Sequence, residues 1–142
     1  MSLLSIHESL QSFTPTGDES EDIGRLYDIT DAIEADGLAA HCVAEMLAVF
    51  ERNPDAGLGS PGPLVHCIET VPMAEFIPPL AQSLERVPTA MTLWMAERCL
   101  RSNPTDDSAA LLISAIKTIP NSETASSELK SVATSTLASH GT

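Results

Sequence analysis

The sequence predicts an all-α chain, a short solenoid of stacked helical hairpins with about seven to eight helices. Three observations predict this class. Apolar residues recur with the helical period, no segment alternates with period 2 for long enough to form a strand, and prolines recur every 16 residues at positions 72, 88, 104 and 120, with Pro54 preceding them by 18. A helix every 16 residues gives a hairpin every 32, the scale of helical-hairpin repeats. A compact irregular bundle is the alternative.

The prolines predict where the helices end. Each proline ends a similar four-residue segment: ERNP (51–54), ETVP (69–72), ERVP (85–88), RSNP (101–104) and KTIP (117–120). Proline lacks the amide hydrogen and clashes with the preceding turn, so each one stops the helix before it. Basic residues stand shortly before four of the stops, where a cation suits the negative end of the helix dipole: Arg52, Arg86, Arg101 and Lys117.

The segments between the stops carry apolar faces of helical spacing. We expect helices over 22–34 (Ile23, Leu26, Thr30, Ile33), 37–52 (Leu38, Cys42, Met46, Val49, Phe50), around Leu64, Val65 and Ile68, over 72–88 (Phe76, Ile77, Leu80, Leu84, Val87), from 105 onward (Ala109, Leu112, Ile113, Ile116, Ile119) and over 123–139 (Leu129, Val132, Ala133, Leu137). Pro78 and Pro79 are expected in the first turn of their helix, and Thr105 or Asp106 as an N-cap. The pattern favours one domain over 1–142, with the ends 1–20 and 121–142 least defined.

The charge is strongly acidic and unevenly distributed. The 142 residues carry 20 acidic and 7 basic side chains, a net charge of −13, of which −10 falls in residues 1–55. This balance argues against nucleic acid as a partner and favours a basic protein, although acidity also simply keeps a protein soluble. No signal peptide or membrane-span run is evident, and three cysteines without a CxxC pair suit reduced thiols. We therefore expect a cytoplasmic protein without membrane contact, monomeric when free.

A glycine- and proline-rich stretch, AGLGSPGPLVHCIET (56–70), stands apart from the rest of the chain. A phosphate loop would need GxxxxGKS/T, yet no Lys or Arg lies between Arg52 and Arg86. The residues instead suit a shaped corner, with Ser60 capping the next helix and Pro61 at its first position. Such a loop on a rigid scaffold can also carry partner contacts.

Candidate catalytic and metal-binding residues are few. The sequence contains no HExxH, GxSxG or dinucleotide-binding motif. The pair His41 and Cys42 is repeated as His66 and Cys67, a pattern that could form a metal site or a Cys–His nucleophile. Adjacent helical residues point about 100° apart, however, so positions in the core are the favoured interpretation. We expect no enzyme, no cofactor and no metal. Trp94 is expected in the core; its alternative role is an interface anchor.

The acidic residues of 18–36 form the predicted binding surface. Asp18, Glu19, Glu21 and Asp22 lie at an expected helix N-terminus, where negative charge is favoured. Asp28, Asp31 and Glu34 follow at spacings of three, opposite Ile23, Leu26 and Ile33, and Asp36 extends the negative field toward the C-terminal end, which the dipole disfavours. Tyr27 is the expected aromatic anchor. A merely solvated face is the alternative.

Two segments, GSPGPLVHCIE (59–69) and SLERVPTAMTLWMAERCL (83–100), resemble small HEAT-like bacterial immunity proteins of contact-dependent growth inhibition and related polymorphic-toxin systems. The resemblance implies a HEAT-like domain that binds and neutralises a cognate toxin C-terminal domain. That toxin domain would be a basic protein and a nuclease, whose active site or substrate cleft the acidic surface blocks. A HEAT-like adaptor that binds a peptide or another protein, with no toxin involved, is the alternative.

Overall fold

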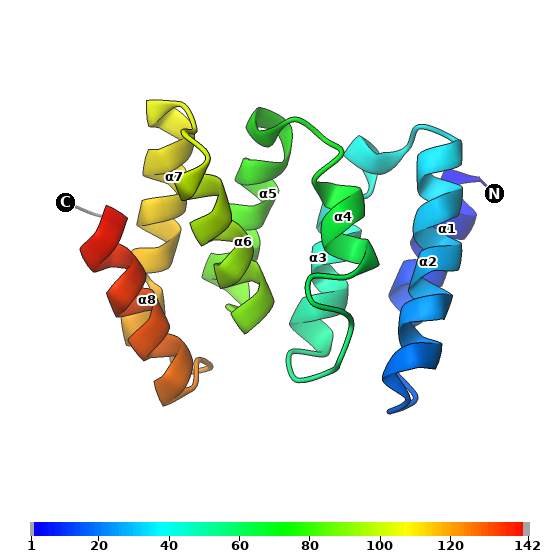
Figure 1. The fold of residues 1–142 in the computed structure, drawn as a ribbon, viewed down its shortest axis with the longest axis horizontal. Coiled ribbons are helices and arrows are strands. Elements are labelled where there is room, and N and C mark those ends of the chain that lie inside the picture. Colours follow the sequence, from blue (N-terminus) through cyan, green and yellow to red (C-terminus); the bar gives the residue numbers. More distant parts are fainter. Residues whose placement is uncertain (1, 141–142) are drawn as a thin grey trace. The chain divides into compact units, whose positions relative to one another are not determined.

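The computed structural model describes residues 2–140, which form eight α-helices, two short 3-10 helices and no strand (Figure 1). The prediction of an all-α chain with about seven to eight helices is thus confirmed. The contacts divide the chain into two compact units, Met1–Pro72 and Met73–Thr142. Each unit is described by itself, and one domain over 1–142 stays a prediction.

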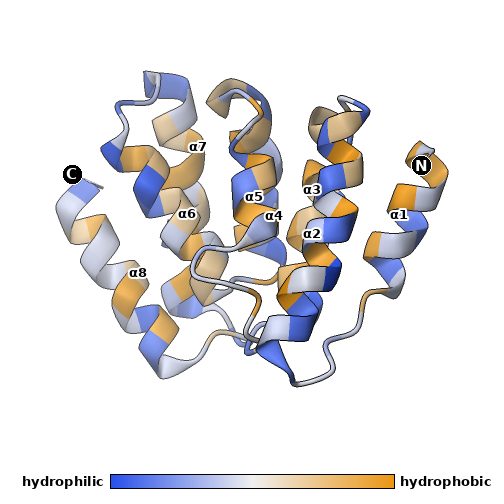
Figure 2. Cartoon of the chain, turned by 45° about the vertical axis from the view of Figure 1, so that its right-hand side comes forward, coloured by the Kyte–Doolittle hydropathy of each residue, from blue (hydrophilic) through white to orange (hydrophobic). Residues whose placement is uncertain are grey.

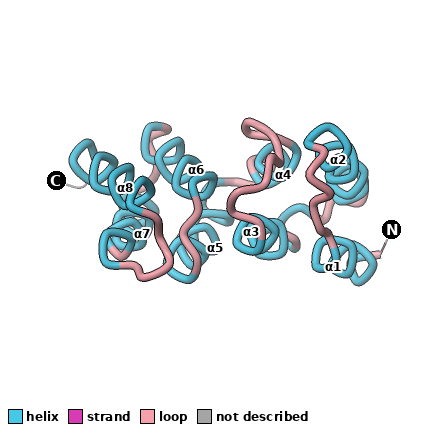
Figure 3. The backbone as a smooth tube through the Cα atoms, turned by 90° about the horizontal axis from the view of Figure 1, so that it is seen from below, coloured by secondary structure: helices cyan, strands magenta, loops and turns pink. Residues whose placement is uncertain are grey.

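The first unit consists of two helical hairpins. Its elements are α1 (Leu3–Ser12), α2 (Glu19–Ala35), η1 (Ala39–His41), α3 (Val43–Arg52) and α4 (Pro63–Ile68). Helix α1 packs beside α3 and α2 packs beside α4, so this unit has two layers (Figure 3). Its core is made of fully buried aliphatic side chains: Ile6, Leu10, Leu26, Ile33, Met46, Leu47, Leu64 and Ile68. Helix α1 was not predicted from the sequence, and it buries only Ile6 and Leu10 of its apolar residues.

The second unit repeats the hairpin arrangement. Its elements are α5 (Met73–Arg86), α6 (Ala90–Arg101), α7 (Asp106–Lys117), η2 (Ile119–Asn121) and α8 (Ser127–His140). Helix α5 packs beside α7, and α6 beside α8. Helix α8 is mostly pale in Figure 2, because it is rich in Ser, Thr and Ala. It buries only Leu129, Ala133 and Thr136. Val132, expected on its apolar face, is 45% exposed.

The prolines mark helix boundaries as predicted. All five lie outside the α-helices: Pro54, Pro72, Pro88, Pro104 and Pro120. Thr105 is the N-cap of α7, and its hydroxyl accepts the Ser108 N–H at 3.2 Å. Thr89 caps α6 in the same way and completes a capping box with Thr92. Local chemistry therefore sets most helix ends.

Pro78 and Pro79 do not lie in a first turn, because α5 begins at Met73 and both prolines are inside it. Each one removes an intrahelical hydrogen bond to the carbonyl four residues earlier. Those carbonyls belong to Ala74 and Glu75, which are exposed, so water can satisfy them. Burial of the opposite side of α5, including Phe76, outweighs the two missing bonds.

Trp94 is not a core residue. Its side chain is 37% exposed on α6, and the Arg98 guanidinium lies 5.5 Å from its ring centroid. The neighbours Leu93 and Met95 occupy the core instead, because they point inward from the same turn. An exposed tryptophan beside an arginine is typical of an interface anchor. This role was the alternative interpretation of Trp94.

The corner before α4 is built on two glycines. Gly62, with φ of 89°, is the N-cap of α4, and Pro63 is the first residue of the helix. The prediction that Ser60 caps this helix is therefore wrong. Gly59 has φ of 111°, and the Ser60–Pro61 peptide bond is cis. A Cβ on Gly59 would collide with the Gly62 Cα, and a Cβ on Gly62 would collide with the Leu58 carbonyl oxygen. Residues 58–59 and residue 62 of the loop backbone lie so close together that neither glycine position has room for a side chain.

We predict that Gly59→Ala or Gly62→Ala lowers the free energy of unfolding by about 1–3 kcal/mol or more. Each substitution places a side chain at a positive φ and also creates a steric collision. Chemical denaturation followed by circular dichroism measures this. Gly24→Ala is the matched control: a Cβ there meets nothing within 4 Å, and alanine in the middle of α2 should stabilise by up to about 1 kcal/mol. Unchanged stability in both loop variants would contradict the packing described.

Candidate protein-binding surface

Helix α2 has one buried and one exposed face. Its buried residues are Asp22, Leu26, Thr30 and Ile33, and it packs against α1 and α4. Asp18 is the N-cap and its carboxylate accepts the Glu21 N–H at 3.1 Å. The predicted acidic residues of the opposite face, Asp28, Asp31 and Glu34, are all exposed. In Figure 2, hydrophilic and hydrophobic residues accordingly alternate along α2.

The three carboxylates cross the exposed face obliquely rather than lying directly above one another. Three residues turn a helix by about 300°, so each successive carboxylate is rotated by about 60°. Asp28 lies toward α1, where it lines a pocket with Phe13 and Arg25. Glu34 lies toward α4, where it lines a second pocket with Thr70. None of the three forms an ion pair within residues 2–140.

Asp22 belongs to the fold and not to the surface. It is 2% exposed, and its carboxylate accepts the Thr16 N–H and the Thr16 hydroxyl, both at 2.9 Å, and the Gly17 N–H at 3.3 Å. Arg25 lies 3.5 Å away and also donates to the Thr14 carbonyl. The hydrogen bond from the Thr16 N–H is the main cause that holds the pKa of Asp22 below its ordinary value. Because Asp22 fixes the connection between α1 and α2, we remove it from the predicted binding residues.

The remaining predicted residues define what we call the acidic surface: Asp18, Glu19, Glu21, Tyr27, Asp28, Asp31, Glu34 and Asp36. Tyr27 is 42% exposed, which leaves its ring available to a partner. The glycine-rich corner adjoins this surface, because a Cβ on Gly57 would lie 2.9 Å from the Glu19 Cδ. The structure thus brings the corner and the N-terminal end of α2 together, which the sequence pattern did not reveal.

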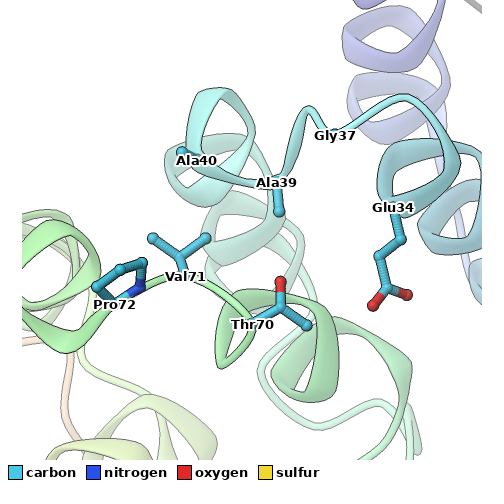
Figure 4. Close-up of a pocket in the computed structure, with 7 residues that line it drawn as sticks. All are labelled: Glu34, Gly37, Ala39, Ala40, Thr70, Val71 and Pro72. Carbon is cyan, nitrogen blue, oxygen red and sulfur yellow. The ribbon is translucent and has the colours of Figure 1, made fainter.

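A pocket of about 370 Å³ lies at the other end of α2. Its walls come from the end of α2, from η1 and from the turn after α4: Glu34, Gly37, Ala39, Ala40, Thr70, Val71 and Pro72 (Figure 4). Sequence reasoning missed it, because small and apolar residues from three separate segments carry no local motif. Glu34 alone was identified beforehand, as a member of the acidic face.

The repeated His–Cys pairs place the cysteines, but not the histidines, in the core. Cys42 and Cys67 are fully buried, whereas His41 and His66 are exposed. Burial raises the pKa of the Cys42 thiol to about 11, and burial followed by the nearby Glu34 carboxylate raises that of Cys67 to about 12. Neither thiol ionises near neutral pH, so neither has the character of a nucleophile. Within the described residues, no group of three or more His, Cys, Asp or Glu side chains is arranged to hold a metal ion.

Comparisons with known proteins return no match to a family model, to a curated protein or to a solved structure. In the part of the chain that the structure describes, no helix combines the length and apolarity needed to cross a bilayer.

We predict that Asp22 makes stability depend on pH. Because its pKa is lowered by folding, its contribution is fully present above its ordinary pKa of 3.8 and is lost as the pH falls through the folded-state value. Urea-unfolding midpoints measured from about pH 5 to about pH 2 should fall less steeply for Asp22→Asn than for the wild type. Gly24→Ala, which adds and removes no titrating group, should keep the wild-type slope. Identical slopes for Asp22→Asn and the wild type would contradict the assignment.

Proposed function

We propose that the chain is an immunity protein that binds the C-terminal domain of a bacterial polymorphic toxin and blocks its active site or substrate cleft. The toxin domain that suits this surface best is a nuclease. The observation that carries the proposal is the acidic surface: its carboxylates are exposed on a well-packed helix, and Asp28, Asp31 and Glu34 form no ion pair in the described residues. Residues 59–69 and 83–100 resemble immunity proteins, and this resemblance is the reason to propose a toxin as the partner.

The charge distribution supports a basic partner. Residues 1–72 carry 13 acidic and 2 basic side chains, a net charge of −11, whereas residues 73–142 carry 7 and 5, a net charge of −2. A concentrated field of one sign steers an oppositely charged protein and raises its association rate. Nuclease clefts are basic because they bind the phosphate backbone, so an acidic surface can occupy them in place of the substrate.

The position of the charges on α2 also favours binding over mere solvation. The C-terminal turn of α2 has no basic residue, yet Glu34 lies in it and Asp36 is the C-cap. Negative charge at this end opposes the helix dipole, at a cost of some tenths of a kcal/mol for each exposed group. An arrangement that costs helix stability is explained if a cationic partner covers it.

A second candidate function is an adaptor that binds a peptide or another protein without a toxin. The exposed Trp94 beside Arg98 favours it, because this pair lies on α6, in the other unit from the acidic surface. Tryptophan and arginine are the residues most enriched among interface hot spots.

The experiment that tests the immunity proposal is a rescue assay. The C-terminal domain encoded by the gene immediately upstream is induced in a bacterial host, and survivors are counted with and without this protein. Restored growth and a complex of the two purified proteins are the expected results. If a demonstrably toxic domain still kills, or the neighbour is not toxic, the adaptor function takes the place of the immunity function.

We predict that the double variant Asp28→Lys, Asp31→Lys slows association with the toxin domain by about 10-fold or more at low salt, because it reverses the steering field. Stopped-flow kinetics at several ionic strengths measures the rate and its salt dependence. Glu85→Lys, Glu123→Lys is the matched control: both positions are exposed, both lie in the second unit, and the net charge changes equally. Equal association rates for the two double variants would remove the steering argument.

A further inference from the structure

The pocket at the C-terminal end of α2 has the chemistry of a site for a cationic side chain. In Figure 4, the Glu34 carboxylate, the Thr70 side chain and the Ala39 methyl group face the same space from α2, from the turn after α4 and from η1. At about 370 Å³ the pocket lies near the lower limit for small-molecule sites, so it suits a single long side chain.

The polar side chains of this pocket, Glu34 and Thr70, offer hydrogen-bond acceptors. Thr70 Oγ1 donates its hydrogen to the Cys67 carbonyl at 2.6 Å, which leaves the lone pairs of the hydroxyl oxygen available. The backbone N–H groups of Gly37, Thr70 and Val71 all donate to carbonyls within the fold, at 3.0–3.2 Å, and Pro72 has none. The carboxylate of Glu34 has no ion-pair partner in residues 2–140. These two side chains therefore favour an occupant that is rich in hydrogen-bond donors.

The helix dipoles give the pocket a negative potential from two directions. Gly37, with φ of 66°, closes α2 in a Schellman motif, in which the Leu38 N–H donates to the Ile33 carbonyl at 2.9 Å. Thr70 and Val71 follow directly after the C-terminal end of α4. The negative ends of two helices thus meet at one pocket whose longer helix, α2, has no basic residue in its last turn. Burial is the main cause of the raised pKa of Cys67, and the Glu34 carboxylate contributes after it.

The other walls of the pocket are apolar. Ala39, Ala40, Val71 and Pro72 offer methyl, isopropyl and ring carbons, which suit a hydrocarbon stem. The Glu34 carboxylate and the C-terminal ends of α2 and α4 disfavour an anion. A metal ion needs more ligands than one carboxylate provides, and a short cation would leave the apolar walls uncovered.

We propose that this pocket binds one arginine side chain of the partner protein, with its stem on the apolar walls and its guanidinium on Glu34 and Thr70. Arginine suits it better than lysine, because a planar fork with five N–H donors can reach acceptors on two walls at once. This inference rests on the proposed function for the identity of the partner, but the pocket chemistry is testable without it. Glu34 is then a specificity residue, distinct in role from the steering carboxylates Asp28 and Asp31.

The first experiment uses a small probe and the full chain. The ¹⁵N-labelled protein is titrated with N-acetyl-arginine-N-methylamide, and separately with the lysine analogue and the citrulline analogue, which has the same shape without the charge. The arginine probe should shift the amide signals of Gly37, Ala39, Ala40, Thr70 and Val71, with an affinity at least several-fold above lysine, and citrulline should not. No shifts at about 50 mM arginine probe, where millimolar binding would saturate, would overturn the proposal.

Matched variants locate the effect. Glu34→Gln should abolish the probe-dependent shifts, whereas Asp28→Asn, which removes an equally exposed carboxylate from the opposite flank of α2, should preserve them. Melting curves confirm that both variants fold. Shifts that survive in Glu34→Gln, or that spread evenly over the acidic surface, would mean nonspecific attraction and would overturn the proposal.

The second experiment uses the toxin domain from the rescue assay. Glu34→Gln should weaken the complex by about 30-fold, mainly through faster dissociation, as expected for a hot-spot arginine that loses its partner. Glu85→Gln, which removes an exposed carboxylate from the second unit, should change affinity by less than about 3-fold. If the protein binds the toxin domain tightly and Glu34→Gln leaves this affinity unchanged, the arginine-pocket proposal is overturned and the immunity function is kept. Binding of the arginine probe without any toxin complex would keep the pocket and overturn the immunity function.

Discussion

The burial of one face of α2 against α1 and α4 is the constraint on which the candidate surface depends. Leu26 and Ile33 are fully buried, and the Asp22 carboxylate ties the start of the helix to Thr16 and Gly17. Once these side chains point inward, the helical period leaves Tyr27, Asp28 and Asp31 no position except the outside. The orientation of the acidic surface is therefore a consequence of core packing.

Core burial is strong enough to tolerate the charge that the surface concentrates. Fully burying an aliphatic side chain contributes about 1.5–3 kcal/mol, and α2 buries both Leu26 and Ile33. Like charges three or four residues apart on an exposed helix cost about 0.2–0.5 kcal/mol per pair, less in salt. Hydrophobic burial exceeds the repulsion several-fold. The fold can hold an unneutralised row of carboxylates ready for a partner without losing the helix.

The features that could be predicted from the sequence are those with local causes. Proline stops such as Pro104 and caps such as Thr105 act within one turn, and the 3.6-residue period identified the exposed face of α2. The features that were missed have tertiary causes. Pro78 and Pro79 lie inside α5 because the helix buries its other side, Asp22 is buried because a preceding loop wraps around it, and Trp94 is exposed because its neighbours fill the core. The pocket at Glu34 joins three segments, so no single stretch of sequence encodes it.

The middle of α2 and its two ends divide the proposed binding into steering and selection. Charge alone is a poor discriminator, since many acidic proteins attract the same basic partner, and discrimination needs a shape that accepts one side chain. At both ends of the surface, glycines fix the backbone: Gly59 and Gly62 fix the corner near Glu19, and Gly37 fixes the turn that forms the pocket wall. A site that is already ordered loses little conformational entropy when it binds. The carboxylates in the middle of α2 can therefore set the rate of encounter, while the glycine-shaped ends set which partner remains bound.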